Sequence, residues 1–335
     1  MDRRWKAPRN LLMHWIVPAV LAVVLLYFSL RGVDWGRVWD TMAGARWELL
    51  ATAMLITCWS SFLRSLRWRI LLNARARIDV PTVFWATMAG YLGNNFLPAR
   101  AGELVRTFAI SSRSNLTRTY VLTTALSERM MDAIALVLWS SVVLMGVHPK
   151  PAWLDQLSRT AAMFAGAGLA AVVVLPHTGD LCEAVIRRLP LPEGLRARLL
   201  HLAEQILLGL RSFHDWKRFA GFVLLTAIVW CSDAFSMMVG ARALHLEMSF
   251  AVAALLLCGL GLGSALPSTP GYVGIFQFVA VSVLTPFGIG KDAAVAYILL
   301  TQAMGYVVVV AFGLPGLYRF RGWRSAVATQ AVSAK

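Results

Sequence analysis

The chain has 335 residues, of which 58% are hydrophobic and only 15% are charged, and its net charge is +15 at neutral pH. Soluble domains carry roughly a quarter charged residues, so this composition excludes an ordinary soluble protein and indicates that the bilayer is the solvent. The excess of Lys and Arg lies in no nucleic-acid-binding motif and fits the positive-inside rule for membrane proteins, so we expect no nucleic-acid partner.

Six apolar stretches of spanning length follow one another along the chain. They lie near residues 11–30, 47–63, 129–147, 158–176, 219–240 and 292–318. A membrane-crossing helix needs roughly 20 apolar residues, and the first stretch is long enough and lacks a clean small-residue cleavage site, so we interpret it as a retained helix and not a signal peptide. The pattern predicts an all-α, multi-pass membrane protein with about six full spans.

Two further apolar segments, 80–111 and 250–287, are interrupted near their middles by the pattern Leu-Pro-x-x-x-Gly. Proline removes a backbone donor and glycine permits the chain to reverse, and a bilayer tolerates such a break only where protein or water satisfies the backbone. A matched pair of breaks is typical of a transport site between two repeats, although a chance recurrence in a leucine-rich chain is the alternative. The expected hinge residues of these re-entrant or broken-helix hairpins are Pro98, Gly102, Pro267, Pro270, Gly271 and Gly274.

The distribution of basic residues orients the spans. With a cytoplasmic N-terminus, the inside segments hold 22 of the 32 Lys and Arg residues and the outside loops hold 7. This asymmetry places both termini in the cytoplasm. The first hairpin then enters from the cytoplasm and the second from outside, which is the arrangement of an inverted pseudo-repeat.

We expect a single integral membrane domain over residues 1–324. Its first half, about 1–176, is joined to the second half, 219–324, by a cytoplasmic connector over 177–218. Apolar residues recur at helical spacing within 194–213, which predicts a connector helix on the membrane surface or a docking site for a partner. The small, polar tail over 325–335 is expected to be disordered.

Ionisable side chains inside apolar segments are the strongest functional signal in this sequence. Each charge costs roughly 2.5–3.5 kcal/mol at the centre of a bilayer, so most of them must be paired or hydrated. Two interpretations stay open: the arginines bind a lipid phosphate while the acids balance them, or the charges form a structural ion-pair network. The residues are Arg100, Glu103 and Arg106 on one helix side after the first break, Glu128, Arg129 and Asp132 in the next segment, and the isolated Asp233.

Neutral polar side chains flank the two breaks. They either cap free backbone groups or form hydrogen bonds with a lipid head group. These candidates are Asn94 and Asn95 before the first break, and Ser268, Thr269 and Gln277 around the second.

Signals for catalysis are weak. The four cysteines and six histidines lack metal-ligand spacing, and the sequence contains no catalytic triad context, Walker loop or nucleotide-binding domain. We therefore expect no metal site, no cofactor and no catalytic residue, and the sequence favours a transporter over an enzyme.

Four motifs resemble, in order, those of the lysylphosphatidylglycerol synthase transmembrane-region family, also called flippase-like domain proteins. They are Arg64-Ser-Leu-Arg67-Trp68-Arg69-Ile-Leu-Leu72, Asn95-Phe-Leu-Pro98-Ala-Arg100-Ala-Gly102-Glu103-Leu-Val-Arg106, Ser127-Glu128-Arg129-Met-Met-Asp132 and Pro267-Ser-Thr-Pro270-Gly271-Tyr-Val-Gly274-Ile-Phe-Gln277. The resemblance implies a polytopic domain that moves or handles an anionic or aminoacylated lipid between leaflets. It also implies that Arg100, Glu103, Arg106, Glu128, Arg129, Asp132 and the turn over 267–274 are the functional positions.

Two departures from the family pattern matter. The family often carries Glu where this chain has Gln277, and the aminoacyl-transferase domain of the lysyl-lipid synthases is missing, so the chain is not expected to make lysyl-lipid itself. Some members are associated with polyprenyl-phosphate sugar pathways, which leaves the cargo open.

The leading hypothesis is a translocase in a bacterial inner membrane whose partner is a lipid with a phosphate-containing head group. The alternatives are a membrane glycosyltransferase, or its accessory subunit, acting on polyprenyl phosphate, and a scaffold that recruits a lipid-modifying enzyme.

Overall fold

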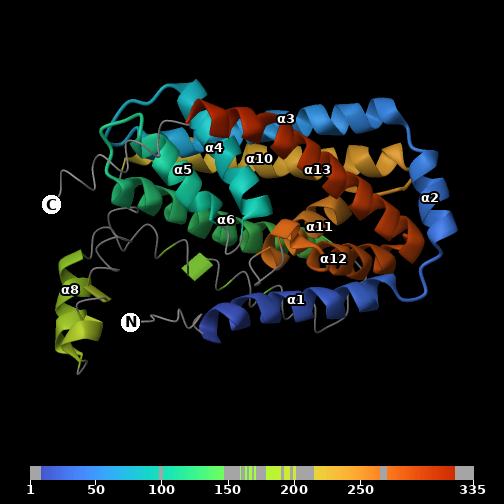
Figure 1. The fold of residues 1–335 in the computed structure, drawn as a ribbon, viewed down its shortest axis with the longest axis horizontal. Helices are drawn as coiled ribbons and strands as arrows, with labels where there is room; N and C mark the ends of the chain where they lie inside the picture. The colour runs from blue at the N-terminus through green and yellow to red at the C-terminus, as the bar shows by residue number, and fades with distance from the viewer. Residues whose placement is uncertain are drawn as a thin grey trace, which may run out of the picture.

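The structure is a computed structural model of the chain. It describes residues 9–97, 101–146, 179–189, 192–196, 215–264 and 270–320, together with a few single positions between 159 and 200. Within these ranges the chain forms helices and no strands (Figure 1). The expected tail, almost all of the expected span over 158–176 and most of the predicted surface helix over 194–213 lie outside the described residues.

Five long helices lie where the other five spans were predicted. Of these, α3, α10 and α13 are long and apolar enough to cross a membrane unaided, whereas α1 does so when taken with α2 (Trp35–Ala43), from which it is bent by 84°. Their bounds are α1, Arg9–Leu30; α3, Trp47–Leu72; α6, Arg118–Gly146; α10, Trp216–Ala243; and α13, Lys291–Arg319.

Two of these helices are longer than the apolar runs predicted. Helix α3 continues to Leu72, although the predicted span ends at residue 63, and α6 begins at Arg118 instead of near residue 129. The reason is that Arg67 on α3 and Glu128 and Asp132 on α6 are paired inside the protein, so their charges do not end the helices.

The first interrupted segment is a helical hairpin. Helix α4 spans Val80–Phe96, with the Asp79 side chain capping its first turn through Thr82 N, and α5 spans Gly102–Ser111. The two helices run antiparallel and touch so closely that a Cβ on Gly102 would lie 1.9 Å from the carbonyl oxygen of Gly90. The predicted hinge residue Gly102 is therefore needed for the closing of the hairpin.

The second interrupted segment is also a hairpin, formed by α11 (Phe250–Gly263) and α12 (Ile275–Leu284) with the 3-10 turn η4 (Pro270–Tyr272) between them. Gly271 and Gly274 have φ angles of 75° and 90°, which L side chains rarely adopt. A Cβ on Gly274 would also lie 2.6 Å from the carbonyl oxygen of Ala22 on α1. These two predicted hinges thus have the backbone geometry that glycine permits.

The two hairpins enter the helix bundle from opposite ends (Figure 1). Helices α3 and α10 lie side by side and antiparallel, since Arg46 N donates to the carbonyl of Ala243 at one end and Arg67 contacts Thr226 towards the other. Each is followed directly by a hairpin, so the hairpins start at opposite ends of the bundle. The turn η4 of the second hairpin packs against α4 of the first.

Each hairpin packs on the helix that follows the other one. Gly313 and Gly316 of α13 lie against α4, and Gly261 of α11 lies against Leu136 of α6. Because α4 packs on α13 and α11 on α6, the two halves of the chain interlock.

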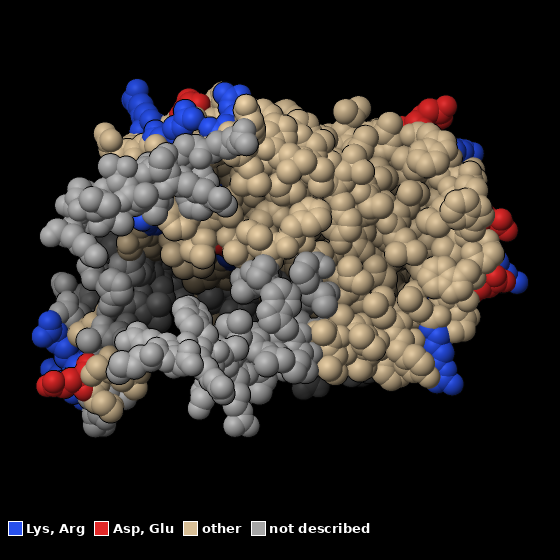
Figure 2. Space-filling view, in the orientation of Figure 1, with Lys and Arg blue, Asp and Glu red and all other residues tan. Residues whose placement is uncertain are grey.

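On the face shown in Figure 2, the described surface is mostly uncharged in the middle and charged towards its ends. In Figure 2, uncharged residues cover the central face, whereas Lys, Arg, Asp and Glu gather towards the two ends of the long axis. Large hydrophobic side chains, including Leu55, Trp59, Leu224 and Val307, are more than half exposed on the helices. An exposed apolar belt of this kind is what a lipid-facing surface requires.

Candidate functional site

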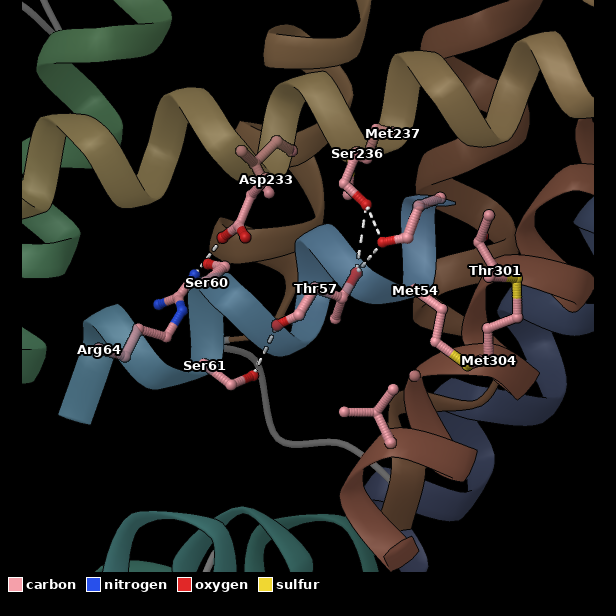
Figure 3. A pocket seen from close by; sticks show the side chains of 14 residues that line it. Met54, Thr57, Ser60, Ser61, Arg64, Asp233, Ser236, Met237, Thr301 and Met304 are labelled. Carbon is pink, nitrogen blue, oxygen red and sulfur yellow. Dashed lines mark hydrogen bonds and ion pairs between the residues drawn. The ribbon is translucent and has the colours of Figure 1, made fainter. Parts of the chain in front are cut away.

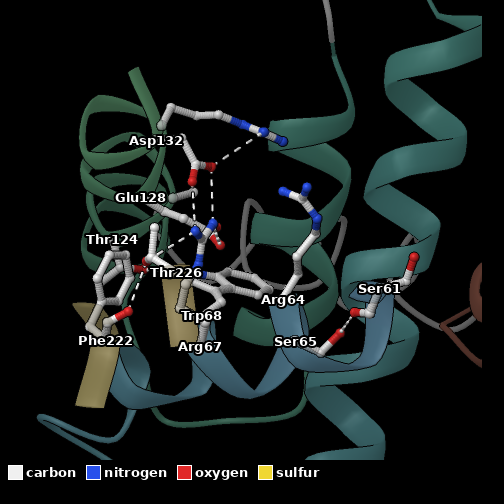
Figure 4. Close-up of polar contacts among 12 residues, drawn as sticks. Ser61, Arg64, Ser65, Arg67, Trp68, Thr124, Glu128, Asp132, Phe222 and Thr226 are labelled. Carbon is white, nitrogen blue, oxygen red and sulfur yellow. Dashed lines mark hydrogen bonds and ion pairs between the residues drawn. The ribbon is translucent and has the colours of Figure 1, made fainter. Parts of the chain in front are cut away.

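A buried guanidinium on α3 is the centre of the polar cluster shown in Figure 4. Arg67 is 1% exposed, and its two terminal nitrogens donate to both carboxylate oxygens of Asp132, at 2.6 and 2.9 Å. The same group donates to Glu128 at 2.9 Å and to the hydroxyl of Thr226 on α10 at 3.3 Å. Arg67 therefore joins α3 to α6 and α10 by charge-assisted hydrogen bonds.

A second buried arginine ties the first hairpin to α6. Arg106 on α5 is also 1% exposed and donates to the other oxygen of Glu128 at 2.8 Å. Its Nε lies 2.5 Å from Glu103, one turn earlier on α5. Glu128 thus accepts from two arginines on two different helices. The hairpin is bound to the bundle by charge, although its helices are mainly apolar.

Aromatic rings shield these two arginines. The guanidinium carbon of Arg106 lies 4.6 Å from the centre of the Trp68 ring, and that of Arg67 lies 5.1 Å from the ring of Phe222. Trp68 is held in place by the bond from its Nε1 to Thr124 at 3.2 Å. Cation–π contacts of this kind strengthen when water is excluded.

Arg129 differs from the other two arginines because its side chain is 41% exposed. It donates from Nε to Glu103 at 2.9 Å, and its Nη1 lies 4.0 Å from Asp132. The cluster therefore contains three arginines, Arg67, Arg106 and Arg129, and three acids, Glu103, Glu128 and Asp132. Its formal charges balance, and its accessible member is a cation.

A separate ion pair joins α3 to α10. Arg64, one turn before Arg67, pairs with Asp233, and its guanidinium carbon lies 5.2 Å from the centre of the Trp230 ring. The sequence suggested no partner for Asp233. The structure corrects this, because the antiparallel packing of α3 and α10 brings Arg64 to it from 169 residues away.

The second hairpin is held by neutral groups at its turn. The amide N–H of Gly274 donates to Gln277 at 2.7 Å, and the Gln277 amide donates to Gln302 on α13 at 2.8 Å. Gln302 and Tyr306 both donate to the carbonyl of Gly271. The Gly271 carbonyl is therefore satisfied by two side chains of α13, and the Gly274 amide is satisfied by Gln277, which acts in this set without a charge.

The structure brings the predicted site residues together in part. Glu103, Arg106, Glu128, Arg129 and Asp132 form one cluster, whereas Gln277 lies in the polar set of the other hairpin. Asn94 donates to Glu103 at 3.3 Å, and Asn95 donates to the carbonyl of Tyr91 at 2.9 Å. Pro98, Arg100, Pro267, Ser268 and Thr269 lie outside the described residues, and Pro270 belongs to η4.

Sequence reasoning from charge and hydropathy missed Arg67, which pairs with both Glu128 and Asp132. The available signal was the spacing of Arg64 and Arg67, three residues apart and directly continuous with an apolar helix. Neighbours at this spacing lie on one side of a helix, which indicates a buried polar side and argues against a loop.

The apolar belt, the long helices, the two hairpins and the buried ionised cluster together define a multi-pass helical membrane protein. The chain belongs to the family of the lysylphosphatidylglycerol synthase transmembrane region, whose model matches residues 15–313. This confirms the resemblance found in the sequence motifs.

Two curated relatives match most of the chain. One is a UPF0104 membrane protein of Methanothermobacter thermautotrophicus, 21% identical over 309 residues, which cover 88% of this chain and 90% of the relative. The other is Glycosyltransferase AglD of Haloferax volcanii, 25% identical over 331 residues, which cover 88% of this chain and 52% of the relative. The chain thus spans about half the length of the second relative. Both are archaeal, so they do not support the expectation of a bacterial membrane.

Proposed function

We propose that the chain is a lipid translocase that carries a lipid with a phosphate-containing head group between leaflets. The observation that carries this proposal is the balanced cluster of three arginines and three acids at the first hairpin, with the exposed Arg129 at its edge. Charged groups within a membrane protein commonly mark the path of a substrate. Transport of an anionic, aminoacylated or polyprenyl-phosphate-linked lipid fits this arrangement.

The transmembrane arrangement we propose has both hairpins re-entrant and both termini in the cytoplasm. The end of the bundle at which α3 stops and α13 ends holds two acids, Asp79 and Asp215, beside the larger basic set Arg75, Arg77, Arg113, Arg118, Lys217, Arg218 and Arg319. At the opposite end, Arg31, Arg37, Arg46, Arg242 and Lys291 are matched by Asp34, Asp40, Glu48, Glu247 and Asp292. The positive-inside rule favours the cytoplasm for the first end.

An inverted pseudo-repeat accounts for the order of the helices. In each half, a long helix is followed by a hairpin and then by another long helix: α3, α4–α5, α6 and α10, α11–α12, α13. Since α3 and α10 are antiparallel, the axis relating them is perpendicular to their length and lies in the plane of the membrane. Under this two-fold relation, the packing of α4 on α13 is equivalent to the packing of α11 on α6. Inverted repeats of this kind provide alternating access.

The electrostatics of the cluster support binding of a phosphate at Arg129. Arg67 and Arg106 are buried and each pairs with two carboxylates, whereas Arg129 has a single close partner, Glu103. A phosphate oxygen that accepts a hydrogen bond from Arg129 replaces the Glu103 carboxylate in a charge-assisted bond. Arg100, just before α5, adds a second guanidinium in this proposal, and the acyl or prenyl chains stay in the lipid. Buried Arg67 and Arg106 keep the acids in place.

The test is translocation by purified protein in proteoliposomes containing a fluorescent phosphatidylglycerol, with dithionite added to bleach the outer leaflet. We expect Arg129→Gln to slow bleaching of the inner pool about tenfold or more, because a hydrogen bond to a charged group contributes roughly 1.5–3 kcal/mol. The matched control is Arg37→Gln, which removes a guanidinium that is 76% exposed in a surface ion pair with Asp34. The control is expected to translocate at the wild-type rate.

Two outcomes count against the proposal. If wild-type protein bleaches no faster than empty liposomes, translocation of this lipid is rejected. If Arg129→Gln and the double variant Arg100→Ala, Arg106→Ala both keep the wild-type rate, the assignment of the site is rejected, even though translocation stands.

A second candidate function is that of a glycosyltransferase or its accessory subunit acting on polyprenyl phosphate. The observation that favours it is the match to Glycosyltransferase AglD, of which this chain covers 52%. Transfer of a labelled sugar from a nucleotide sugar to polyprenyl phosphate by the pure protein supports this function. Lipid translocation without sugar transfer contradicts it.

A further inference from the structure

A cavity of about 270 Å³ lies between α3, α10 and α13, on the side of α3 that carries Arg64 (Figure 3). It is slightly smaller than the roughly 300–1,000 Å³ typical of sites for drug-sized ligands, so it has room for a head group and not for a whole lipid. The buried ion-pair cluster around Glu128 does not line it. The cavity is therefore a site separate from the one proposed for phosphate.

Four of the hydroxyl groups that line the cavity donate their hydrogens to backbone carbonyls. Thr57 donates to the carbonyl of Ala53 at 2.9 Å, and Ser61 donates to the carbonyl of Thr57 at the same distance. Ser236 donates to Ala53 at 2.8 Å, and Thr301 to the carbonyl of Tyr297 at 2.8 Å. The Thr57 and Ser236 oxygens also lie 3.2 Å from each other, so these two share one contact. A hydroxyl oxygen has two lone pairs, so the four oxygens retain capacity to accept hydrogen bonds from a ligand.

Ser60 adds a polar group that lacks a partner. It is 1% exposed, it lines the cavity, and its hydroxyl forms no hydrogen bond within the described part of the chain. A buried polar group without a partner is costly unless a ligand or water satisfies it. In Figure 3, Ser60 lies beside the pair of Arg64 and Asp233, whose side chains are 17% and 15% exposed.

The charge of the cavity selects a neutral ligand. Arg64 and Asp233 are paired with each other, so a cation or an anion gains a partner there only by breaking that pair. A neutral group with several hydroxyls leaves the pair intact, donates to the hydroxyl oxygens and Asp233, and accepts from Arg64. Met54, Met237 and Met304 supply adaptable apolar contacts for the C–H faces of such a group.

We propose that this cavity binds a neutral polyol, such as the sugar, inositol or glycerol part of a lipid head group. The inference rests on the proposed function for its lipid, because the polyol occupies the cavity while the phosphate of the same class of lipid is bound at Arg129. Its test measures binding and not translocation.

The experiment is native mass spectrometry of the purified protein with three short-chain lipids: dioctanoyl phosphatidylinositol, phosphatidic acid and phosphatidylethanolamine. All three carry a phosphate, but phosphatidylinositol has a polyol and phosphatidylethanolamine has an ammonium group. We expect phosphatidylinositol to bind at least about tenfold more tightly than the other two. Free myo-inositol is titrated in parallel to tell a soluble polyol from a lipid head group as the source; either source supports the proposed chemistry.

Filling the cavity removes this preference. Gly305 lines it, and a Cβ at that position meets no heavy atom within 4 Å, so Gly305→Leu occupies the cavity without a clash at its Cβ. The expected result is loss of the tenfold preference with unchanged binding of phosphatidic acid, whereas the matched Gly305→Ala keeps the preference. Ser60→Ala is expected to weaken the binding of phosphatidylinositol by about two- to tenfold, the range for one hydrogen bond, and to leave the binding of the other two lipids unchanged.

The proposal is overturned if phosphatidylinositol binds no more tightly than phosphatidic acid, or if its preference survives both Gly305→Leu and Ser60→Ala. Tighter binding of phosphatidylethanolamine overturns it in favour of a cation. Failure of the proposed phosphate site is distinguishable from failure of the polyol site. Arg129→Gln is expected to weaken the binding of phosphatidylinositol and of phosphatidic acid by the same factor, so the ratio of their two affinities stays unchanged.

Discussion

Replacing Arg67 with methionine tests whether the buried cluster holds the helices together. Arg67→Met replaces the guanidinium by an uncharged side chain of similar length. It removes the hydrogen bonds to both oxygens of Asp132 and the bond to Glu128. Glu128 retains Arg106 at 2.8 Å, whereas Asp132 is left with Arg129 at 4.0 Å. Asp132 is 7% exposed, so the variant contains one buried carboxylate without a close cation.

The structure sets the magnitude of this effect. Removing one partner of a buried ion pair typically costs about 3–5 kcal/mol of unfolding free energy, since the other charge stays buried. Equilibrium unfolding in mixed micelles with increasing dodecyl sulfate measures it. The control Arg37→Met removes an ion pair whose side chains are 76% and 57% exposed, and exposed pairs contribute about 0–1 kcal/mol.

A double variant separates charge from packing. Arg67→Met combined with Asp132→Leu restores neutrality, leaving Arg106 and Arg129 with Glu103 and Glu128. Replacement of a buried pair by apolar groups is often neutral or stabilising, so we expect the double variant to recover most of the loss. If Arg67→Met costs less than about 1 kcal/mol, or if the double variant is less stable than either single one, the reasoning from buried charge is refuted.

Three further predictions concern the hairpins. Gly102→Ala is expected to abolish stable folding of the first hairpin, because its Cβ would lie 1.9 Å from the carbonyl oxygen of Gly90. If the variant resists limited proteolysis as well as the wild type does, this prediction is wrong. Tyr306→Phe removes the hydroxyl that donates to the Gly271 carbonyl and is expected to lower unfolding free energy by about 0.5–1.5 kcal/mol, measured in the same micelle assay; no change would argue against that bond. Gln277→Glu introduces the acid that the family often carries at this position. It is expected to lower the unfolding free energy more than Gln277→Met does, since it buries a charge and loses the donor to Gln302. The reverse order would show that the site accepts a carboxylate.

The positions of the hairpins were predictable because their signals are local. Asp79 and Ser249 cap the first turns of α4 and α11, and the predicted segments 80–111 and 250–287 contain both helices of each hairpin. Capping side chains, apolar runs and Pro–Gly breaks act within a few residues of themselves. The sequence therefore predicted where the hairpins begin and end, although their depth in the membrane stays a prediction.

The partners inside the cluster were not predictable in the same way. Arg67 lies 61 residues from Glu128 and 65 from Asp132, and Gln302 lies 31 residues from Gly271. No local pattern encodes such pairs, because they depend on how α3, α6 and α13 pack. Hydropathy ended the predicted span at residue 63 and so left Arg67 outside it, whereas the packing of α6 and α10 against α3 provides its partners.

The cross-packing of the halves affects the order in which this protein is completed during synthesis. Helix α4 emerges early, but the surface that covers it belongs to α13, the last described helix of the chain. Gly313 and Gly316 fit against α4 with no room for larger side chains, so lipids that occupy this groove meanwhile must leave before α13 docks. A ribosome that stalls before α13 is made would leave an unfinished molecule with its first hairpin uncovered, and such an intermediate is a natural target for membrane quality-control proteases.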